Sequence, residues 1–126
     1  MRLLLLADIH RTTYDLCSGL ESHGFEVMHC DDARVGLSRA CLQDWRVIVL
    51  DATMAWQDAL VWLEEFRSRA ASTPVIVLSA PNDVAAAIHS LRLGADDCLA
   101  KPFELDDLVA RISTVLQRTA SSGSKA

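Results

Sequence analysis

The sequence predicts an α/β fold in which a doubly wound, five-stranded parallel sheet carries helices on both faces. Short apolar runs recur along the chain, and segments with helical periodicity separate them. Parallel strands need crossover connections of this kind, and such crossovers are right-handed. At 126 residues, 51% of them hydrophobic, the chain has the size of one domain with a substantial core.

The predicted strands are short and mostly aliphatic. The central strand, residues 47–51, is an unbroken apolar run ending on Asp51, which is typical of a strand buried on both faces of a parallel sheet. The other predicted strands are residues 2–7, 25–30, 75–79 and 98–100.

Helices are predicted between these strands from apolar spacing and from start and stop signals. Thr12 or Thr13 caps the first helix, which stops at His23-Gly24, and Asp31-Asp32 precede the second. Asp83 caps the fourth helix. The third helix covers about residues 57–69, the fourth ends near residue 93, and the fifth covers residues 105–118. Residues 1–118 are therefore predicted to form one domain, and residues 119–126, which lack periodicity, a flexible linker or tail.

Composition narrows the functional classes. A net charge of −5 without a cluster of Lys or Arg argues against nucleic-acid binding by this segment. No run is long enough to span a membrane, and the apolar start breaks at Asp8 without a signal-peptide cleavage site, so we expect a cytoplasmic protein. The widely spaced cysteines and histidines lack metal-ligand spacing, and we expect the cysteines to be small buried hydrophobic residues: Cys17, Cys30, Cys41 and Cys98.

Polar residues stand at the ends of several predicted strands. Ligands of open parallel sheets gather at the carboxyl ends of the strands. Asp51 could carry a phosphoryl group there, with Asp8 helping to hold Mg²⁺. Ser79 supplies a hydroxyl donor and Lys101 a fixed cation. A single Asp after a strand is more often a turn former or helix cap, so the combination carries the prediction.

Residues 73–80 (TPVIVLSA) and 93–103 (LGADDCLAKPF) resemble the receiver domain of bacterial two-component response regulators. The resemblance covers essentially residues 1–118 and is most specific over residues 93–103. Residues 101–112 resemble receivers that precede winged-helix DNA-binding domains. The resemblance implies a flavodoxin-like fold with strand order 2-1-3-4-5.

The same resemblance implies roles for individual residues. Asp51 would accept a phosphoryl group from a histidine of a sensor histidine kinase, and Asp8, Asp51 and the backbone carbonyl of Thr53 would bind Mg²⁺. Lys101 would pair with the phosphoryl oxygens, and Ser79 would swing in to donate a hydrogen bond to them. The domain would be a signalling module that catalyses only its own phosphorylation and dephosphorylation, and Lys101-Pro102 resembles the family's cis peptide.

The chain departs from the family pattern around this site. Ala7 replaces one of a pair of acids, so we expect weaker Mg²⁺ binding. Cys98 replaces the aromatic switch residue that is coupled to Ser79, which weakens or rewires that switch. Ala55-Trp56 replaces a Pro-Gly pair, so Trp56 could lie over the site.

The resemblance also implies a homodimer through the fourth helix, the fifth strand and the fifth helix. Cross-subunit salt bridges would use Asp96, Asp97, Asp107, Arg111 and Arg118, although Ala87 stands where Asp107 would find a basic partner. The alternative is that these are solvated charges, which stabilise weakly. DNA would be contacted only by an output domain that this chain does not contain.

Three functions follow from these observations. The first is a phosphoacceptor receiver whose phosphorylation controls dimerisation and a DNA-binding output domain. The second is an atypical receiver that acts as a phosphorylation-independent interaction module, favoured by Ala7 and Cys98. The third, an enzyme for a phosphorylated or nucleotide substrate, is disfavoured because no glycine-rich phosphate-binding loop follows any predicted strand.

Overall fold

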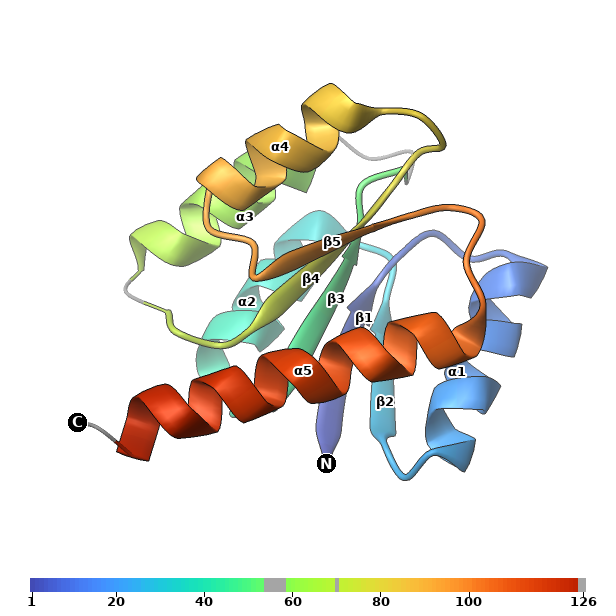
Figure 1. Ribbon diagram of the computed structural model, residues 1–126, viewed down its shortest axis with the longest axis horizontal. Helices are drawn as coiled ribbons and strands as arrows, with labels where there is room; N and C mark the ends of the chain where they lie inside the picture. Colours follow the sequence, from blue (N-terminus) through green and yellow to red (C-terminus); the bar gives the residue numbers. More distant parts are fainter. Residues whose placement is uncertain (54–58, 70, 125–126) are drawn as a thin grey trace.

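The computed structural model describes residues 1–53, 59–69 and 71–124, and it confirms the predicted α/β fold. All strand pairs are parallel, and the strand order is β2-β1-β3-β4-β5, as expected (Figure 1). The elements in chain order are β1 (Arg2–Leu6), α1 (Arg11–Ser22), β2 (Glu26–Cys30), α2 (Ala33–Leu42), β3 (Val47–Asp51), α3 (Ala59–Ser68), β4 (Val75–Ser79), α4 (Val84–Arg92), β5 (Asp97–Ala100) and α5 (Leu105–Ser124).

The sheet separates two hydrophobic cores because successive side chains of a strand point to opposite faces. In β3, Ile48 and Leu50 join Trp62 and Phe66 of α3 on the face that α2, α3 and α4 cover. Their neighbours Val47 and Val49 face α1 and α5, where they join a core that includes Leu20, Leu108 and Ile112. Figure 1 shows α5 and α1 on one side of the sheet and α2, α3 and α4 on the other. Burial on both faces fixes the register of β3 and therefore the position of Asp51.

The helix starts follow the predictions at two helices and depart from them at a third. Asp32 and Asp83 cap α2 and α4 by accepting hydrogen bonds from the backbone N–H groups of Val35 and Ala86. The predicted threonine cap of α1 was wrong, because the N-cap is His10, which makes no side-chain cap. Thr13 lies buried within the helix, and its hydroxyl donates instead to the carbonyl of Asp8 at 2.8 Å.

The ends of α3 and α5 also differ from the predicted ranges. The start predicted near Gln57 lies outside the described residues, and α3 covers Ala59–Ser68. The helix α5 continues to Ser124, past the predicted end at Arg118. Alanine and serine keep their backbone N–H donors, so the helical hydrogen bonds can extend without a proline to stop them. That residues 119–126 serve as a linker stays a prediction.

The cysteines differ in exposure. All four are free, Cys30 is buried, and Cys17 and Cys98 are partly buried. The expectation of burial was wrong for Cys41, which is exposed on α2 because its neighbour Ala40 faces the core in that turn. Within the described residues, no helix combines the length and the apolar character needed to cross a bilayer.

Candidate functional site

Asp51 ends the most deeply buried part of the sheet. It is the last residue of β3, which lies between β1 and β4, and only 8% of its surface is exposed. A carboxylate at such a position needs hydrogen-bond donors or a cation, because burial without them is costly. The donors and the cation that contact the Asp51 carboxylate therefore determine the chemistry of the site.

Lys101 and Thr53 both bind the Asp51 carboxylate. The Lys101 ammonium lies 2.7 Å from Asp51 Oδ2. Thr53 donates to Asp51 Oδ1 twice, from its backbone N–H at 2.8 Å and from its hydroxyl at 2.6 Å. Lys101 also donates to the Thr53 hydroxyl oxygen at 2.9 Å. The site therefore contains a carboxylate, a cation and a hydroxyl in mutual contact.

The strand ends position Lys101 and Ser79. The backbone N–H of Lys101 donates to the Ser79 carbonyl at 2.9 Å, which fixes the exit from β5 against the end of β4. The Lys101-Pro102 peptide is cis, as expected. Ser79 is only 2% exposed, and its hydroxyl has no hydrogen-bond partner in the described part of the chain. Because buried hydroxyls usually have a partner, this one is available to a group that enters the site.

Asp8 follows β1 at the same edge of the sheet, where its backbone is held from two sides. Thr13 donates to the carbonyl of Asp8, and the His29 ring Nε2 lies 2.7 Å from the carbonyl of Ala7. Sequence reasoning missed both contacts, because Thr13 and His29 contact backbone carbonyls and neither residue is a polar group directly after a predicted strand. Across residues 1–53, 59–69 and 71–124, no three His, Cys, Asp or Glu side chains form a group that could hold a metal.

The oxygen groups present nevertheless suit Mg²⁺. Asp8, Asp51 and the Thr53 carbonyl would be hard oxygen ligands, and Mg²⁺ commonly binds through one or two carboxylates while it keeps several waters. Receiver domains generally bind Mg²⁺. Ala7, which is 3% exposed, adds no oxygen to this set.

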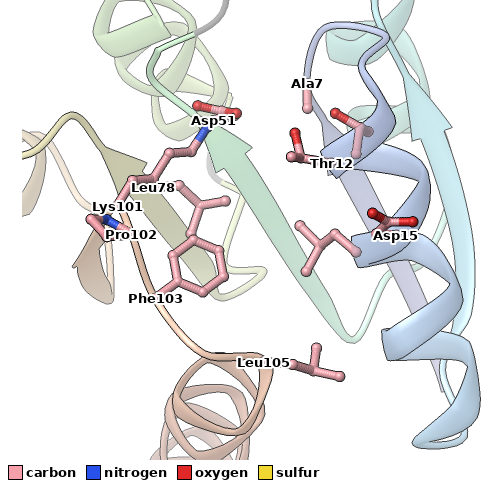
Figure 2. A pocket seen from close by; sticks show the side chains of 11 residues that line it. Ala7, Thr12, Asp15, Asp51, Leu78, Lys101, Pro102, Phe103 and Leu105 are labelled. Carbon is pink, nitrogen blue, oxygen red and sulfur yellow. Dashed lines mark hydrogen bonds and ion pairs between the residues drawn. The ribbon is translucent and has the colours of Figure 1, made fainter.

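A cavity of about 420 Å³ opens beside Asp51 (Figure 2). Ala7, Thr12 and Asp15 lie on one side of it, opposite Lys101 and Phe103 on the other. The remaining lining residues are Thr13, Leu16, Leu78, Pro102 and Leu105. The cavity gives a small molecule a route to Asp51 along walls that are apolar except near the carboxylates, the threonines and the lysine.

The predicted dimer-face charges are bound within the chain. Arg111 pairs with Asp97 at 2.9 Å, and Arg118 donates to the backbone carbonyl of Asp96 at 3.3 Å. Asp107 accepts a long hydrogen bond, 3.4 Å, from the backbone N–H of Glu104 at the start of α5.

The side chain of Asp96 belongs to a cluster that the sequence did not predict. Arg67 of α3 pairs with Asp96 at 2.9 Å and donates to the carbonyl oxygens of Ala71, Thr73 and Gly94. Burial lowers the pKa of the Arg67 guanidinium from its usual value, and Asp96 opposes that shift. No sequence motif marked this arginine, because the carbonyls that it contacts belong to the backbone.

The two remaining predicted positions are Cys98 and Trp56. Cys98 is half-buried in β5 and packs against the core that α2, α3 and α4 cover. Its backbone carbonyl accepts a hydrogen bond from Arg111 at 3.5 Å. The predicted placement of Trp56 over the site lies outside the described residues.

Comparison with known proteins gives one consistent family. The model of the response regulator receiver domain matches residues 4–113. The transcriptional activator protein IrlR of Burkholderia pseudomallei is 39% identical over 118 residues, which cover 94% of this chain and 51% of that protein. The transcriptional regulatory protein PcoR of Escherichia coli is 33% identical over 120 residues, 95% of this chain and 53% of that protein. The chain thus spans about half the length of these curated relatives.

Solved structures agree with this assignment. The receiver domain of the Francisella response regulator 1452 has a TM-score of 0.86 and 30% identity, covering 94% of this chain and 98% of that one. A response regulator from Chloroflexus aurantiacus has a TM-score of 0.82 and 27% identity, covering 92% of this chain and 97% of that one.

Proposed function

Because this chain belongs to the response regulator receiver domain family, we propose that Asp51 is the residue that accepts the phosphoryl group. One observation carries the proposal: the Lys101 ammonium lies 2.7 Å from a carboxylate that is only 8% exposed and stands at the carboxyl end of the central strand. Catalysis of phosphoryl transfer is largely positioning and charge neutralisation, and a fixed cation supplies part of both. The donor in the cell would be a phosphohistidine of a sensor histidine kinase.

Lys101 and Ser79 then take complementary roles. Lys101 would move its ion pair from the carboxylate to the phosphoryl oxygens as they arrive. The buried Ser79 hydroxyl, which lacks a partner among the described residues, would turn to donate a hydrogen bond to one of them. Ser79 and Cys98 would carry the change onward to the surface formed by α4, β5 and α5.

The test of the acceptor is intact-protein mass spectrometry after incubation with acetyl phosphate and Mg²⁺. We expect a single phosphoryl adduct in the parent protein and none in Asp51→Asn. Asp96→Asn is the matched control, because it removes a carboxylate that is also ion-paired but lies at the opposite edge of the sheet, and it should keep the adduct. An unmodified parent protein would support a phosphorylation-independent interaction module instead.

We propose that Asp8, Asp51 and the Thr53 carbonyl hold the Mg²⁺ that phosphoryl transfer needs, and that Ala7 makes this binding weak. An acid at position 7 would face the cavity beside Asp51, where it could orient a metal-bound water. Ala7→Asp should therefore tighten Mg²⁺ binding by about tenfold, in the range expected for outer-shell partners. Amide chemical shifts during a Mg²⁺ titration would measure this, with Ala7→Asn as the control of similar size. Equal affinities of the parent and Ala7→Asp would contradict the proposal.

A homodimer through α4, β5 and α5 is the proposed response to phosphorylation. Val84, Ile88 and Leu91 lie on one face of α4 and are 66%, 47% and 47% exposed, so this surface offers apolar area to a second copy. The neighbouring charged side chains already have partners within the chain. Arg111 pairs with Asp97, and Arg118 donates to the backbone carbonyl of Asp96. These side chains would exchange partners on dimerisation. An exchange of exposed pairs contributes little net free energy, about 0–1 kcal/mol per pair, so the apolar contacts should dominate.

Size-exclusion chromatography with light scattering tests the dimer. Ile88→Glu should prevent any dimer that acetyl phosphate and Mg²⁺ induce while leaving the phosphoryl adduct intact. Val61→Glu, on the exposed surface of α3 with 58% exposure, is the matched control and should still dimerise. A dimer that survives Ile88→Glu would place the contact elsewhere. Since the curated relatives are transcriptional regulators twice as long as this chain, we propose that any DNA contact belongs to an output domain.

A further inference from the structure

The cavity beside Asp51 has the size and the walls of a site for a small organic molecule. Its volume of about 420 Å³ lies within the range of about 300–1,000 Å³ that is usual for ligand pockets. Four apolar side chains of the core between the sheet, α1 and α5 line it: Leu16, Leu78, Phe103 and Leu105. The transfer of a phosphoryl group to Asp51 does not need such walls, so they suit a ligand with an apolar body.

The walls of the cavity are formed by packed elements and leave room beside the end of β1. Leu105 lies at the end of the cavity away from Asp51 (Figure 2). A Cβ added at Gly19 would lie 2.6 Å from Leu105 Cδ2, so α1 and the start of α5 are in close contact there. Near Asp51 the wall includes Ala7, which adds only a methyl group. The acid that the family pattern has at this position would take up part of that space.

Asp15 gives the cavity a negative charge that no described residue neutralises. Asp51 and Lys101 pair at 2.7 Å, so their charges largely cancel. Asp15 is exposed in α1, and among the described residues it has neither a hydrogen bond nor an ion pair, including with Arg11 one helical turn earlier. Thr12, on the same helix, adds a hydroxyl that can accept a hydrogen bond. The charge of the lining therefore favours a cation.

An aromatic ring stands across the cavity from this carboxylate. Figure 2 shows Phe103 on the side opposite Asp15. The face of an aromatic ring attracts cations and also offers apolar area to a ligand. A ligand that combines an ammonium group with an aromatic or aliphatic body would thus meet complementary chemistry at both walls.

We propose that this cavity binds an organic amine in its cationic form, with its apolar body among the leucines and Phe103 and its ammonium paired with Asp15, and that the bound amine blocks access to Asp51. Asp51 and Lys101 line the same cavity, so a bound amine lies in the path of a small phosphodonor. This second part rests on Asp51 being the acceptor. The domain would then be a receiver whose phosphorylation a small amine inhibits.

The binding test is an amide chemical-shift titration with three indoles of similar shape and different charge: tryptamine, the neutral tryptophol and the anionic indole-3-propionate. We expect tryptamine to give saturable shifts at Leu16 and Leu105. It should bind about fivefold more tightly than tryptophol, a factor that corresponds to about 1 kcal/mol for an exposed ion pair. Indole-3-propionate should bind most weakly. Methylamine, which has the charge without the apolar body, should give no saturable shift.

Two variants of α1 separate the site from the overall charge of the domain. Asp15→Asn keeps the size of the side chain, removes its charge and should bind tryptamine and tryptophol equally. Glu21→Gln is the matched control, because Glu21 is exposed on the same helix and does not line the cavity, and it should keep the preference for tryptamine. Equal binding of the two indoles by the parent protein would overturn the proposal. A preference that persists in Asp15→Asn, or shifts confined to another part of the domain, would do the same.

The block on Asp51 is tested by following the phosphoryl adduct by intact mass with phosphoramidate and Mg²⁺. Phosphoramidate is the donor because, unlike acetyl phosphate, it cannot acetylate an amine. Tryptamine at about ten times its Kd leaves about one cavity in eleven empty, so the adduct should form about tenfold more slowly. A bound amine that leaves the rate unchanged would contradict the block. Absence of the adduct both with and without tryptamine would instead contradict Asp51 as the acceptor, whereas the titration alone decides whether the cavity binds the amine.

Discussion

The ion pairs Arg67–Asp96 and Lys101–Asp51 lie at opposite edges of the same sheet and are held in different ways. Their N–O distances are similar, 2.9 Å and 2.7 Å. In the first pair the side chains of Arg67 and Asp96 are 19% and 37% exposed, and in the second pair those of Lys101 and Asp51 are 34% and 11% exposed. Distance therefore does not distinguish them, and burial differs only in that the cation is the more buried partner in the first pair and the carboxylate in the second. The other groups that each cation binds distinguish the two pairs.

At the amino-terminal edge, the partners of Arg67 are mostly backbone atoms. The guanidinium donates to the carbonyls of Ala71 and Thr73, before β4, and of Gly94, before β5, at 2.7–3.1 Å. Asp96 Oδ2 also accepts from the backbone N–H of Val75 at 2.8 Å. Breaking this pair would leave backbone groups of two loops unsatisfied.

At the carboxyl-terminal edge, the partners of the Lys101 ammonium within the described residues are side-chain atoms of Asp51 and Thr53. Side chains can rotate apart without moving the backbone, so this pair can open while the fold stays intact. The comparison teaches that similar ion pairs can be held in different ways: Arg67 joins the backbone of two loops, whereas the Lys101 ammonium contacts side chains that can rotate.

The largest expected effect is on stability at Arg67. Arg67→Ala should lower the free energy of unfolding by about 2–4 kcal/mol, because it leaves three partly buried carbonyls and a carboxylate without their donor. Urea denaturation would measure this. The matched control is Arg69→Ala just after the same helix, whose pair with Glu65 is half exposed on both sides. It should change stability by less than about 1 kcal/mol. Equal losses of unfolding free energy in the two variants would mean that the Arg67 pair stabilises the fold no more than an exposed ion pair does.

A second, smaller effect tests how closely Arg67 packs against the turn before β5. A Cβ added at Gly94, where φ is +113°, would lie 2.9 Å from Arg67 Cγ, whereas one added at Gly24, where φ is +92°, would meet nothing within 4 Å. Both Gly→Ala variants should lose about 1–2 kcal/mol from the positive φ. Gly94→Ala should lose about 1 kcal/mol more, from displacement of the arginine.

Thermal or urea unfolding of the two glycine variants gives the comparison directly. In the Arg67→Ala background the excess at Gly94 should vanish, since the clashing side chain is gone. An excess that persists there would mean that Gly94→Ala strains some other contact, and Arg67 would then not be the group that requires glycine at this turn.

The same contrast explains what the sequence could predict. The fold and strand order followed from aliphatic runs such as residues 47–51 and from the motif at residues 93–103, because a strand buried on both faces leaves a continuous signal. Asp51 and Lys101 were predicted because they stand at strand ends and have complementary charges. Both lie at the edge where the structure joins them.

The contacts that escaped prediction depend on geometry rather than residue type. Arg67 binds carbonyl oxygens, which every residue has, so no pattern in the sequence marks its partners. His29 contacts the carbonyl of Ala7 for the same reason. The Thr53 hydroxyl could have been suspected from its place two residues after Asp51, since short polar side chains often bond nearby groups, but its contact with Lys101 spans a long separation in the sequence.

The smallest expected effect is the coupling between Lys101 and Asp51 themselves. A double-mutant cycle with Lys101→Met and Asp51→Asn should give a coupling free energy of about 0.5–1 kcal/mol, because Lys101 is one-third exposed and its long side chain loses entropy in the pair. The equivalent cycle with Arg67→Met and Asp96→Asn should give a larger value, about 1–2 kcal/mol, since the guanidinium is oriented by carbonyls before it meets the carboxylate.

The dependence of the two coupling free energies on ionic strength provides a further test. Raising the ionic strength to about 1 M shortens the screening length to about 3 Å, which should reduce the coupling at the more exposed Lys101 ammonium more than at the Arg67 guanidinium. If the coupling between Lys101 and Asp51 proved the stronger and the less sensitive to salt, the lysine would be a fixed structural partner of the carboxylate. Phosphoryl transfer would then have to break the stronger of the two ion pairs. The carboxyl-terminal edge, and not the amino-terminal edge, would hold the more strongly coupled pair.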